Sequence, residues 1–398
     1  MIKGIIGAVI GDIAGSSREG KPVSRMSFKL FTKDSSVTDD STLTIAVAEW
    51  MLDRENVDIA QSLIKWATEY PHAGYGSSFK RFLANGSHMT PGSTHNGAVM
   101  RVSPVGYLAS SLEECLDLAR ESALPSHDSP QAIAGAQAAA AAIFMARTGS
   151  SKDSIREYLE KKFRYNLHRS YDEVREEVRF ARASRETDYE ASHERIVGAE
   201  PAVQDALIAF LSGNDYEDVI RKAIYLGGDA DTEAAIAGGI AAAYYGVPEK
   251  LIEQSLIYIP SDMLEVINKV DGTSWKPSKL IPPKSSRWSV NDVVICGCNA
   301  DETKGERAFH LIRPSRFRRH YNQGYPIHIA GIDMEKTLDQ IWVLRRKCED
   351  YKHVRWHLHD VGIESGVFTV EQFRELFGWA LELDNVLVTP TLLNQESK

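Results

Sequence analysis

The sequence predicts an all-α domain followed by a second, small α/β domain. Residues 1–275 place apolar side chains at helical spacing in one segment after another, without a continuous strand pattern. Residues 276–287 are rich in proline, serine and lysine, a composition typical of a linker. Residues 288–398 instead combine short apolar runs with longer amphipathic segments. We therefore expect two domains joined by this linker.

Four segments support the helical prediction for the first domain. Thr42–Leu52 has one apolar face, and Gln131–Ala146 consists mainly of alanine, the residue with the best helix propensity. The charged segment Ser154–Arg182 predicts a pair of surface helices. Glu233–Tyr245 presents a face of small residues, namely Ala234, Gly238, Ala241 and Ala242. Faces of alanine and glycine allow neighbouring helices to approach closely.

The second domain shows a different alternation of elements. Short buried strands are predicted at Val293–Cys296, Pro326–Ala330 and Asn385–Thr389. Amphipathic helices are predicted at Met334–Tyr351 and Val370–Leu383. The role of this domain stays open at this stage.

Two patterns in the second domain each allow two interpretations. The basic and aromatic run Arg313–Tyr321 is either a site for phosphate or nucleic acid or, more commonly for such a run, a solvated face. His357 and His359 alternate as in a strand, so they share one face with spacing suitable for a metal. Solvated or core histidines are the more common case.

Bulk composition limits the class of protein. The chain has 398 residues, 43% hydrophobic and 25% charged, which is ordinary for a soluble globular protein. A formal net charge of −9 argues against a general binder of nucleic acid or anionic membranes. No signal peptide or membrane span is expected. Four scattered cysteines do not form a disulfide framework, so we expect a cytoplasmic protein with reduced thiols.

Two acidic runs nearly two hundred residues apart carry the main functional signal. Thr38-Asp39-Asp40 and Gly227-Gly228-Asp229-Ala230-Asp231-Thr232 each stand directly before a predicted helix. A single Asp or Thr in such a place usually caps the helix. Adjacent carboxylates exceed what a cap needs, and they repel one another unless a cation offsets their charge. Their hard oxygen atoms suit Mg²⁺ or Mn²⁺, with enough charge for two ions.

Three further pieces are weaker when taken alone. In Gly11–Glu19, Gly15 is expected to permit a tight exit from the first helix, and Glu19 then lies on the following loop. Asn96-Gly97 permits positive φ and exposes backbone amides that suit a phosphate, although an ordinary turn before a helix is the simpler interpretation. His127 is either a neighbour of a helix cap or a ligand contact.

In this order, these pieces resemble the ADP-ribosylglycohydrolase family, which includes the dinitrogenase-reductase-activating glycohydrolase and the animal ADP-ribosyl-acceptor hydrolases. The resemblance runs from Met1 to about Lys269. Its motifs are G-D-x-x-G-x-x-x-E, T-D-D followed by Ser, N-G-x-x-M-R, a histidine before an alanine-rich helix, and G-G-D-x-D-T. It implies an orthogonal all-helical bundle with two Mg²⁺ ions at the bottom of a cleft, Mn²⁺ being an alternative.

Carried over residue by residue, the resemblance assigns roles to the motif positions. It implies metal coordination by Thr38, Asp39, Asp40, Asp229, Asp231 and Thr232. Glu19 matches a glutamate near the metals that assists catalysis, and Asp229 is the other candidate to accept a proton from water. The implied substrate-binding residues are Asn96, Gly97, Met100, His127, Gly227 and Gly228.

The chain departs from the family pattern at three positions. His95 stands where members often carry glycine, Ser129 where many bacterial relatives have a second histidine, and His193 where many have a cysteine. None of these positions is an implied metal ligand. These departures therefore put the leaving-group preference in question.

The resemblance implies a Mg²⁺-dependent hydrolase that cleaves the N- or O-glycosidic bond of ADP-ribose conjugates. Its expected partner is ADP-ribose or an ADP-ribosylated protein, with ADP-ribosylated nucleic acid as an alternative, and we expect a monomer. Two rival classes are a non-catalytic ADP-ribose-binding module and a crystallin-like structural protein, neither of which needs all six metal-binding side chains. The sequence does not identify the acceptor atom.

Overall fold

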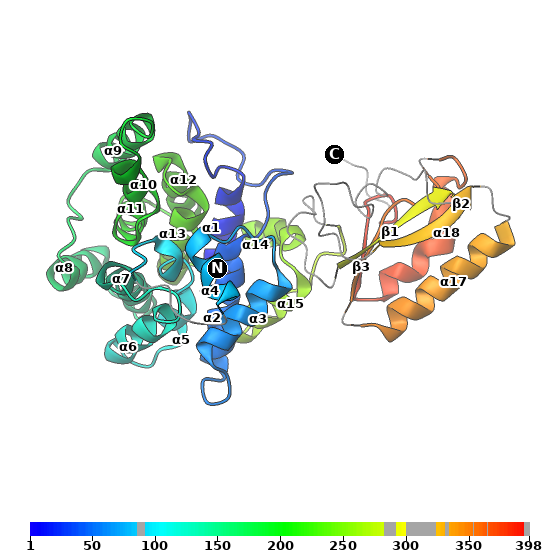
Figure 1. Ribbon diagram of the computed structural model, residues 1–398, viewed down its shortest axis with the longest axis horizontal. Coiled ribbons are helices and arrows are strands. Elements are labelled where there is room, and N and C mark those ends of the chain that lie inside the picture. The colour runs from blue at the N-terminus through cyan, green and yellow to red at the C-terminus, as the bar shows by residue number, and fades with distance from the viewer. Residues whose placement is uncertain are drawn as a thin grey trace. The chain divides into compact units, whose positions relative to one another are not determined.

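The computed structural model describes residues 1–85, 92–281, 292–299, 324–330, 334–352, 354–363 and 365–393. The chain divides into two compact units, Met1–Lys276 and Pro277–Lys398. The first unit is all-helical and the second contains a parallel sheet (Figure 1). The predicted fold class, an all-α bundle followed by a small α/β domain, is confirmed.

The helices of unit 1 follow one another in this order: α1 (Ile6–Ser16), α2 (Asp39–Leu52), α3 (Ile59–Glu69), α4 (Ser77–Ala84), the 3₁₀ turn η1 (Asn96–Ala98), α5 (Ser103–Leu108), α6 (Leu112–Ala123), α7 (Pro130–Arg147), α8 (Lys152–Phe163), α9 (Tyr171–Ala183), α10 (Tyr189–Val197), α11 (Ala199–Ser212), α12 (Tyr216–Leu226), α13 (Ala230–Tyr245), α14 (Glu249–Ser255), the 3₁₀ turn η2 (Leu256–Tyr258) and α15 (Ser261–Asp271). The four segments predicted as helical all lie in helices, and the charged segment forms the pair α8 and α9.

A glycine seam on α1 holds the two central helices of unit 1 together. Gly7, Gly11 and Gly15 recur every four residues and therefore share one face of α1. A methyl group on Gly11 would overlap the carbonyl oxygen of Ala234, and one on Gly15 would overlap that of Ala230. The backbones of α1 and α13 are thus in direct contact, and this contact brings the start of α13 beside the end of α1.

The seam corrects the role expected for Gly15. This residue lies inside α1, which continues to Ser16, so it does not form the exit from the helix. Its small size is needed because the backbone of α13 passes directly against it. The small-residue face predicted on α13 supplies the other side of this contact through Ala234, Gly238 and Ala242.

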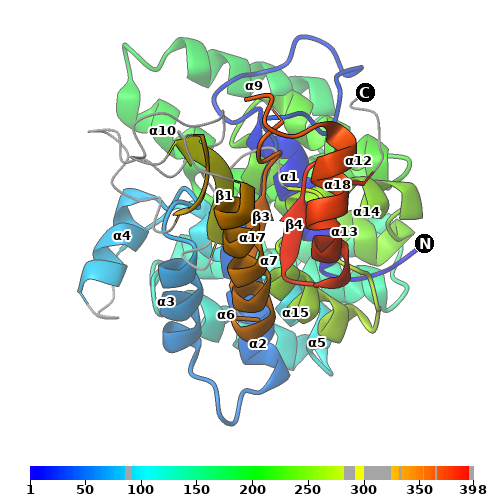
Figure 2. The ribbon, with the colours of Figure 1, turned by 90° about the vertical axis from the view of Figure 1, so that its right-hand side faces the viewer.

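Unit 2 is built on a four-stranded parallel sheet of order β2-β1-β3-β4. Its elements are β1 (Asp292–Asn299), β2 (Gly324–Ala330), α17 (Met334–Asp350), β3 (Arg355–Leu358), α18 (Val370–Phe377), the 3₁₀ turn η4 (Gly378–Glu382) and β4 (Val386–Val388). Alternate apolar residues of the strands form one core cluster with residues of α17 and α18. Figure 2 labels these two helices together with the strands β1, β3 and β4. Residues 279–281, in the predicted linker, hydrogen-bond to Val388 of β4 through their backbone.

His357 of unit 2 belongs to a buried cluster with Asp292 and Arg355, and the partly buried His359 lies near it. The Nε2 atom of His357 lies 2.7 Å from Oδ1 of Asp292, which also accepts a hydrogen bond of 2.9 Å from Nε of Arg355. The guanidinium and the imidazole hold the pKa of Asp292 down, at about 2, against the effect of its burial. Burial lowers the pKa of His359 to about 4. This arrangement favours the structural interpretation of the pair, and the basic run Arg313–Tyr321 lies outside the described residues.

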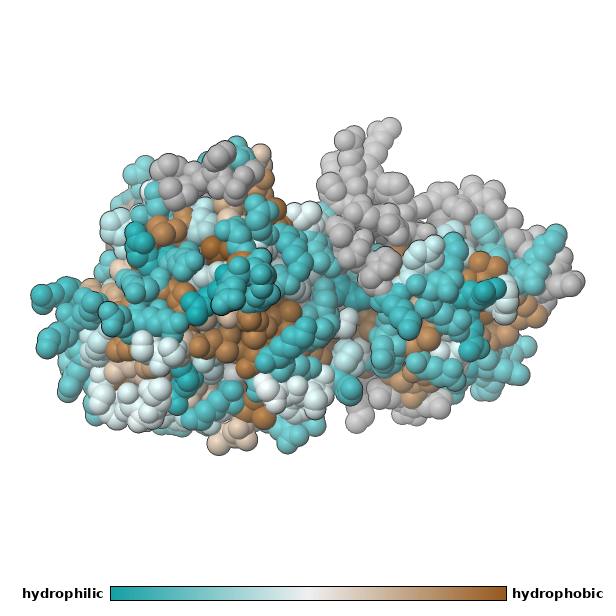
Figure 3. Space-filling model, turned by 90° about the horizontal axis from the view of Figure 1, so that it is seen from below, coloured by the Kyte–Doolittle hydropathy of each residue, from teal (hydrophilic) through white to brown (hydrophobic). Residues whose placement is uncertain are grey.

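Hydrophilic residues cover much of the face shown in Figure 3, with apolar residues exposed between them. Among the residues that the structure describes, no helix combines the length and apolar character needed to cross a bilayer.

The glycine seam generates a stability prediction. Replacing Gly11 with Ala forces a methyl group into the carbonyl of Ala234, so we expect the free energy of unfolding to fall by about 1–3 kcal/mol. Chemical denaturation followed by circular dichroism measures this change. Gly76→Ala is the control, because no heavy atom lies within 4 Å of the added methyl group. Equal stability of the two variants would contradict the direct backbone contact.

Candidate metal centre and ligand cavity

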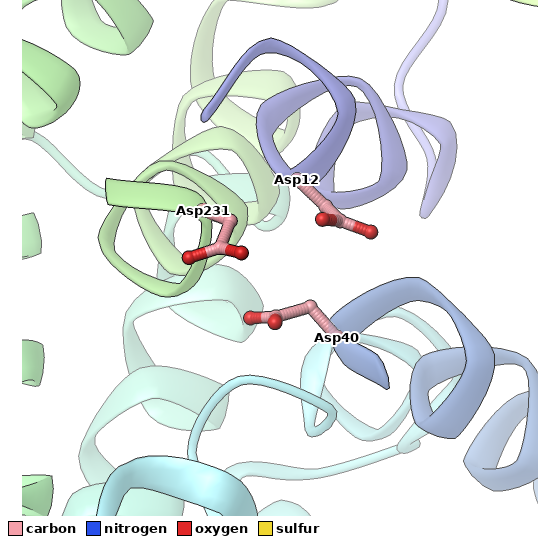
Figure 4. Close-up of side chains that lie close together, drawn as sticks. All are labelled: Asp12, Asp40 and Asp231. Carbon is pink, nitrogen blue, oxygen red and sulfur yellow. The ribbon is translucent and has the colours of Figure 1, made fainter. Parts of the chain in front are cut away.

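Three carboxylates from distant parts of the sequence converge at one buried point. Asp12 comes from α1, Asp40 from the first turn of α2 and Asp231 from the first turn of α13 (Figure 4). One oxygen atom from each lies within 4.8 Å of the others, and exposed fractions are 0%, 3% and 4%. The two predicted acidic runs therefore meet, and Asp12 joins them.

Asp12 was not assigned a role from the sequence, yet it organises the cluster. Its Oδ2 atom accepts hydrogen bonds from the backbone N–H groups of Thr38, at 2.9 Å, and Ser41, at 3.1 Å, and from the hydroxyl of Ser41. Its Oδ1 atom lies 2.7 Å from Oγ1 of Thr38. These contacts fasten the start of α2 to α1. A lone carboxylate inside an otherwise apolar helix was the available sequence signal.

The electrostatics of the cluster fit a cation. Burial raises the pKa of Asp40 well above its ordinary value, and the charges of Asp12, Asp39 and Asp229 raise it further. Burial likewise raises the pKa of Asp231, with Asp229 as its strongest charged neighbour. Within the described part of the chain, Oδ1 of Asp40 is buried without a hydrogen-bond donor. An orphaned carboxylate oxygen among other hard oxygen atoms matches what a divalent cation binds.

Helix capping accounts for only one residue of the acidic runs. Thr38 is the N-cap of α2, and its hydroxyl accepts a hydrogen bond from the N–H of Asp40. Asp229 occupies the N-cap position of α13 but makes no capping hydrogen bond with its side chain. Its Oδ2 atom instead accepts a hydrogen bond of 2.8 Å from Nδ2 of Asn96. The carboxylates are thus directed to one another and to the cavity.

The acidic cluster opens into a cavity of about 380 Å³. This volume lies at the lower end of the range of small-molecule sites. Most of the residues predicted for the site line it, namely Glu19, Asp39, Asp40, Asn96, Gly97, Met100, His127, Asp229, Asp231 and Thr232. Thr38 is buried beside them and contacts Asp12 and Asp40. Glu19 is on the exposed segment after α1.

Asn96-Gly97 does not adopt the positive φ that this pair permits, and it forms a turn before a helix. Neither Asn96 nor Gly97 has a positive φ, and the 3₁₀ turn η1 begins at Asn96. Gly97 leaves room for His127, because a methyl group on it would lie 3.0 Å from the ring of His127 and press on it. His127 lines the cavity, while Ser129 caps α7. Burial lowers the pKa of His127 to about 3, so its ring is neutral.

Gly227 and Gly228 are not among the residues that line the cavity. Gly227 has φ of +87°, the left-handed conformation that glycine favours, and it ends α12. The guanidinium of Arg182, on α9, donates hydrogen bonds to the carbonyl oxygens of both glycines, from Nη2 to Gly228 at 2.7 Å. Arg182 therefore fixes the loop that presents Asp229, a role that no sequence motif indicated.

Fold and site together define, in unit 1, an all-α domain with a candidate metal centre at the base of a ligand-sized cavity. The sequence model of the ADP-ribosylglycohydrolase family matches residues 1–273, and the chain belongs to this family.

The proteins similar to this chain include two whose names describe an activity. ADP-ribosylhydrolase ARH3 of Mus musculus is 27% identical over 266 residues, which cover 53% of this chain and 70% of that protein. ADP-ribosylarginine hydrolase Tri1 of Serratia proteamaculans is 22% identical, covering 64% and 75% of the two chains. An uncharacterized protein of Archaeoglobus fulgidus is 30% identical, covering 54% and 74%. A solved structure described as an ADP-ribosylglycohydrolase-related protein complex is 24% identical in sequence, with a TM-score of 0.49. The match covers 68% of this chain and 96% of the chain in that structure.

The buried carboxylates predict a dependence of stability on pH and metal. In the metal-free protein the raised pKa of Asp40 means that the folded state binds more protons than the unfolded state. Stability should therefore increase as pH falls from the raised pKa of Asp40 toward the ordinary pKa of a carboxyl group, and stop increasing once the unfolded chain is also protonated. Melting curves in EDTA across this range measure the effect.

Asp40→Asn removes one of the repelling charges. We expect its Tm in EDTA at neutral pH to exceed that of the wild type by on the order of 2–4 °C, with a flatter pH dependence. Because a candidate metal ligand is lost, Mg²⁺ should raise the Tm of the variant less than that of the wild type. An equal response of both proteins to Mg²⁺ would argue against Asp40 as a ligand.

Arg182→Met tests whether the hydrogen bonds of Arg182 hold the loop that presents Asp229. Releasing the two glycine carbonyls loosens the loop that carries Asp229, so metal affinity should fall by about 10- to 100-fold. Titration of Mg²⁺ followed by thermal shift gives this affinity. The matched control is Arg179→Met on the same helix, whose side chain is 61% exposed and pairs with Glu176. The control should bind Mg²⁺ as the wild type does.

Proposed function

We propose that this protein is a metal-dependent hydrolase that removes ADP-ribose from a modified acceptor by cleaving an N- or O-glycosidic bond. The convergence of Asp12, Asp40 and Asp231 at the base of a cavity lined by the family's motifs carries the proposal. The names of the relatives support the same class of reaction. The particular acceptor is not specified by these observations.

The oxygen atoms that would hold two divalent cations, Mg²⁺ or Mn²⁺, come from both acidic runs. They belong to Thr38, Asp39, Asp40, Asp229, Asp231 and Thr232, and Asp12 is added by its place in the cluster. When bound, such ions lower the pKa of water and so provide a nucleophile near neutral pH.

The protein's own groups have separable roles in the proposed reaction. Asp229 is oriented by Asn96, so one of its oxygen atoms is already engaged while the carboxylate faces the cavity. Glu19 lines the same cavity from an exposed segment, where it is able to accept a proton and pass it to solvent. Carboxylates that surround the sugar would stabilise an oxocarbenium-like transition state electrostatically.

Asp231→Ala tests the proposal. The loss of a buried carboxylate from the cluster should lower the release of ADP-ribose by at least about 100-fold, because metal binding and charge stabilisation both depend on it. Release is measured by chromatography on a panel of defined substrates linked through arginine, serine or a nucleic-acid base. Excess EDTA should have the same effect on the wild type.

Asp34→Ala serves as the control, since Asp34 is exposed and outside the cavity. Full activity of Asp231→Ala, or of the wild type in EDTA, would contradict a metal-dependent hydrolase. Binding of ADP-ribose by calorimetry without turnover of any substrate would favour a non-catalytic binding module instead. Monomeric state and cytoplasmic localisation stay predictions of the sequence.

A further inference from the structure

A positively charged loop follows α1 and begins at the cavity. We call residues 17–34 the basic loop, which is drawn in dark blue beyond α1 in Figure 1. It contains five cationic and two acidic side chains, a net charge of +3, whereas the whole chain carries −9. Its residue Glu19 lines the cavity that holds the acidic cluster. Positive charge is therefore concentrated at one edge of the site, in a protein that is acidic overall.

Four cations of the basic loop have no role in holding the protein together. They recur at every fourth position, namely Lys21, Arg25, Lys29 and Lys33, and all four are exposed. Within the described part of the chain, none of their side chains forms an ion pair. Neighbouring like charges repel one another and do not stabilise the fold. Their charge is thus available to an anionic partner.

The rest of unit 1 fixes the backbone of the basic loop, although the loop contains neither helix nor strand. Nη1 of Arg221, on α12, donates hydrogen bonds to the carbonyl oxygens of Met26, at 3.1 Å, and Phe28, at 2.6 Å. The hydroxyl of Tyr258 donates one of 3.2 Å to the carbonyl of Thr32. The exposed cations are therefore carried on a backbone of defined position.

The start of the basic loop lies beside the residues that surround the acidic cluster. A methyl group on Gly227 would lie 3.4 Å from Cβ of Pro22, so the basic loop passes next to the loop that presents Asp229. Lys21 follows two residues after Glu19, which lines the cavity while being exposed. A macromolecular acceptor is too large for a cavity of about 380 Å³ and must lie outside it. On this side of the opening, it meets the basic loop.

The surface of the basic loop favours phosphate groups over a protein partner. Large apolar side chains anchor most protein interfaces, yet the exposed large hydrophobic residues of the described chain include none from this loop. The ring of Phe28 is covered by Arg18 and Arg221, whose guanidinium carbons lie 5.7 and 5.3 Å from its centre. Ser24 and Ser27 stand exposed between the cations. Lysine, arginine and serine are common donors to nucleic-acid phosphates.

The negative charge of the whole chain does not oppose this local interaction. At physiological ionic strength, charges farther apart than about 8 Å are largely screened. The potential that a bound polyanion experiences is therefore set by the side chains next to it. A net charge of −9 excludes binding over the whole surface but leaves a local cationic site effective.

We propose that the basic loop binds the phosphate backbone of a nucleic acid and thereby directs the hydrolase to ADP-ribose attached to nucleic acid. This inference rests on the proposed function and names the class of acceptor that the proposed function leaves open. Contacts to phosphates carry no information about base sequence, so the loop selects the type of polymer.

Binding of a fluorescent single-stranded DNA oligonucleotide by the full chain tests the inference. Anisotropy measures Kd at several salt concentrations. The loop variant combines Arg25→Gln with Lys29→Gln. The matched control combines Lys161→Gln with Lys162→Gln, which removes two exposed cations from α8, outside the cavity, and changes the net charge equally.

The loop variant should raise Kd by about tenfold or more at low salt, because two phosphate contacts are lost. The slope of log Kd against log salt concentration should fall by roughly 1.4, since each contact to a single strand contributes about 0.7. Turnover should follow binding. For an oligonucleotide carrying ADP-ribose on a base, kcat/KM should fall by about tenfold, while kcat/KM for a peptide carrying it on arginine stays constant. The control should behave as the wild type in both measurements.

Equal Kd and slope in the loop variant and the wild type would overturn the inference and leave the proposed function standing. Cleavage of the arginine peptide without cleavage of the oligonucleotide would do the same. An acidic peptide that binds more tightly than the oligonucleotide, and loses affinity in the loop variant, would overturn it in favour of an acidic protein partner. A folded wild-type protein that cleaves no substrate would overturn the proposed function, and with it the inference that a bound nucleic acid is the substrate. Circular dichroism confirms that all variants are folded.

Discussion

Direct contact between the backbones of α1 and α13 is the constraint on which the site depends. Gly7, Gly11 and Gly15 carry no side chain, so the backbone of α1 packs directly against α13. The end of α1 and the start of α13 are therefore in contact. Asp12 and Asp231 are carried on these two ends. A wider separation of the helices would move the carboxylates apart and leave no common point for a cation.

Bringing the carboxylates together at this contact costs free energy, and nearby hydrogen bonds offset part of that cost. Three carboxylates in a buried space repel one another, and burial raises the pKa of each. Hydrogen bonds from the first turn of α2 to Asp12 compensate part of this cost, because the N–H groups at a helix start stabilise negative charge. Among the described residues, Oδ1 of Asp40 has no hydrogen-bond donor, and a divalent cation would supply the missing positive charge.

The fold and much of the site could be predicted from the sequence, and particular residues show where this ends. Helical spacing and the change of composition near residue 276 are local properties, so they gave the two-part architecture. Asp39-Asp40 and Asp229–Asp231 exceeded what capping needs, so they indicated a shared cation. Asp12 offered only the weak signal of a lone carboxylate in an apolar helix, and Arg182 offered none, because its hydrogen bonds reach Gly227 and Gly228 in a distant part of the sequence. His357 has a metal-like spacing, yet its partner Asp292 is 65 residues away, and only the fold reveals that pairing.

The buried carboxylates and the aromatic residues of the cavity come from different elements of unit 1. The carboxylates come from α1, α2 and α13, which form the rigid centre of unit 1. His95 lies in the loop before η1, and Tyr189 and His193 lie on α10. Asn96 links the two parts through its hydrogen bond to Asp229, and the residue beside it is one of the departures from the family pattern. This hydrogen bond is therefore a contact through which a change in the loop before η1 can reach the carboxylates.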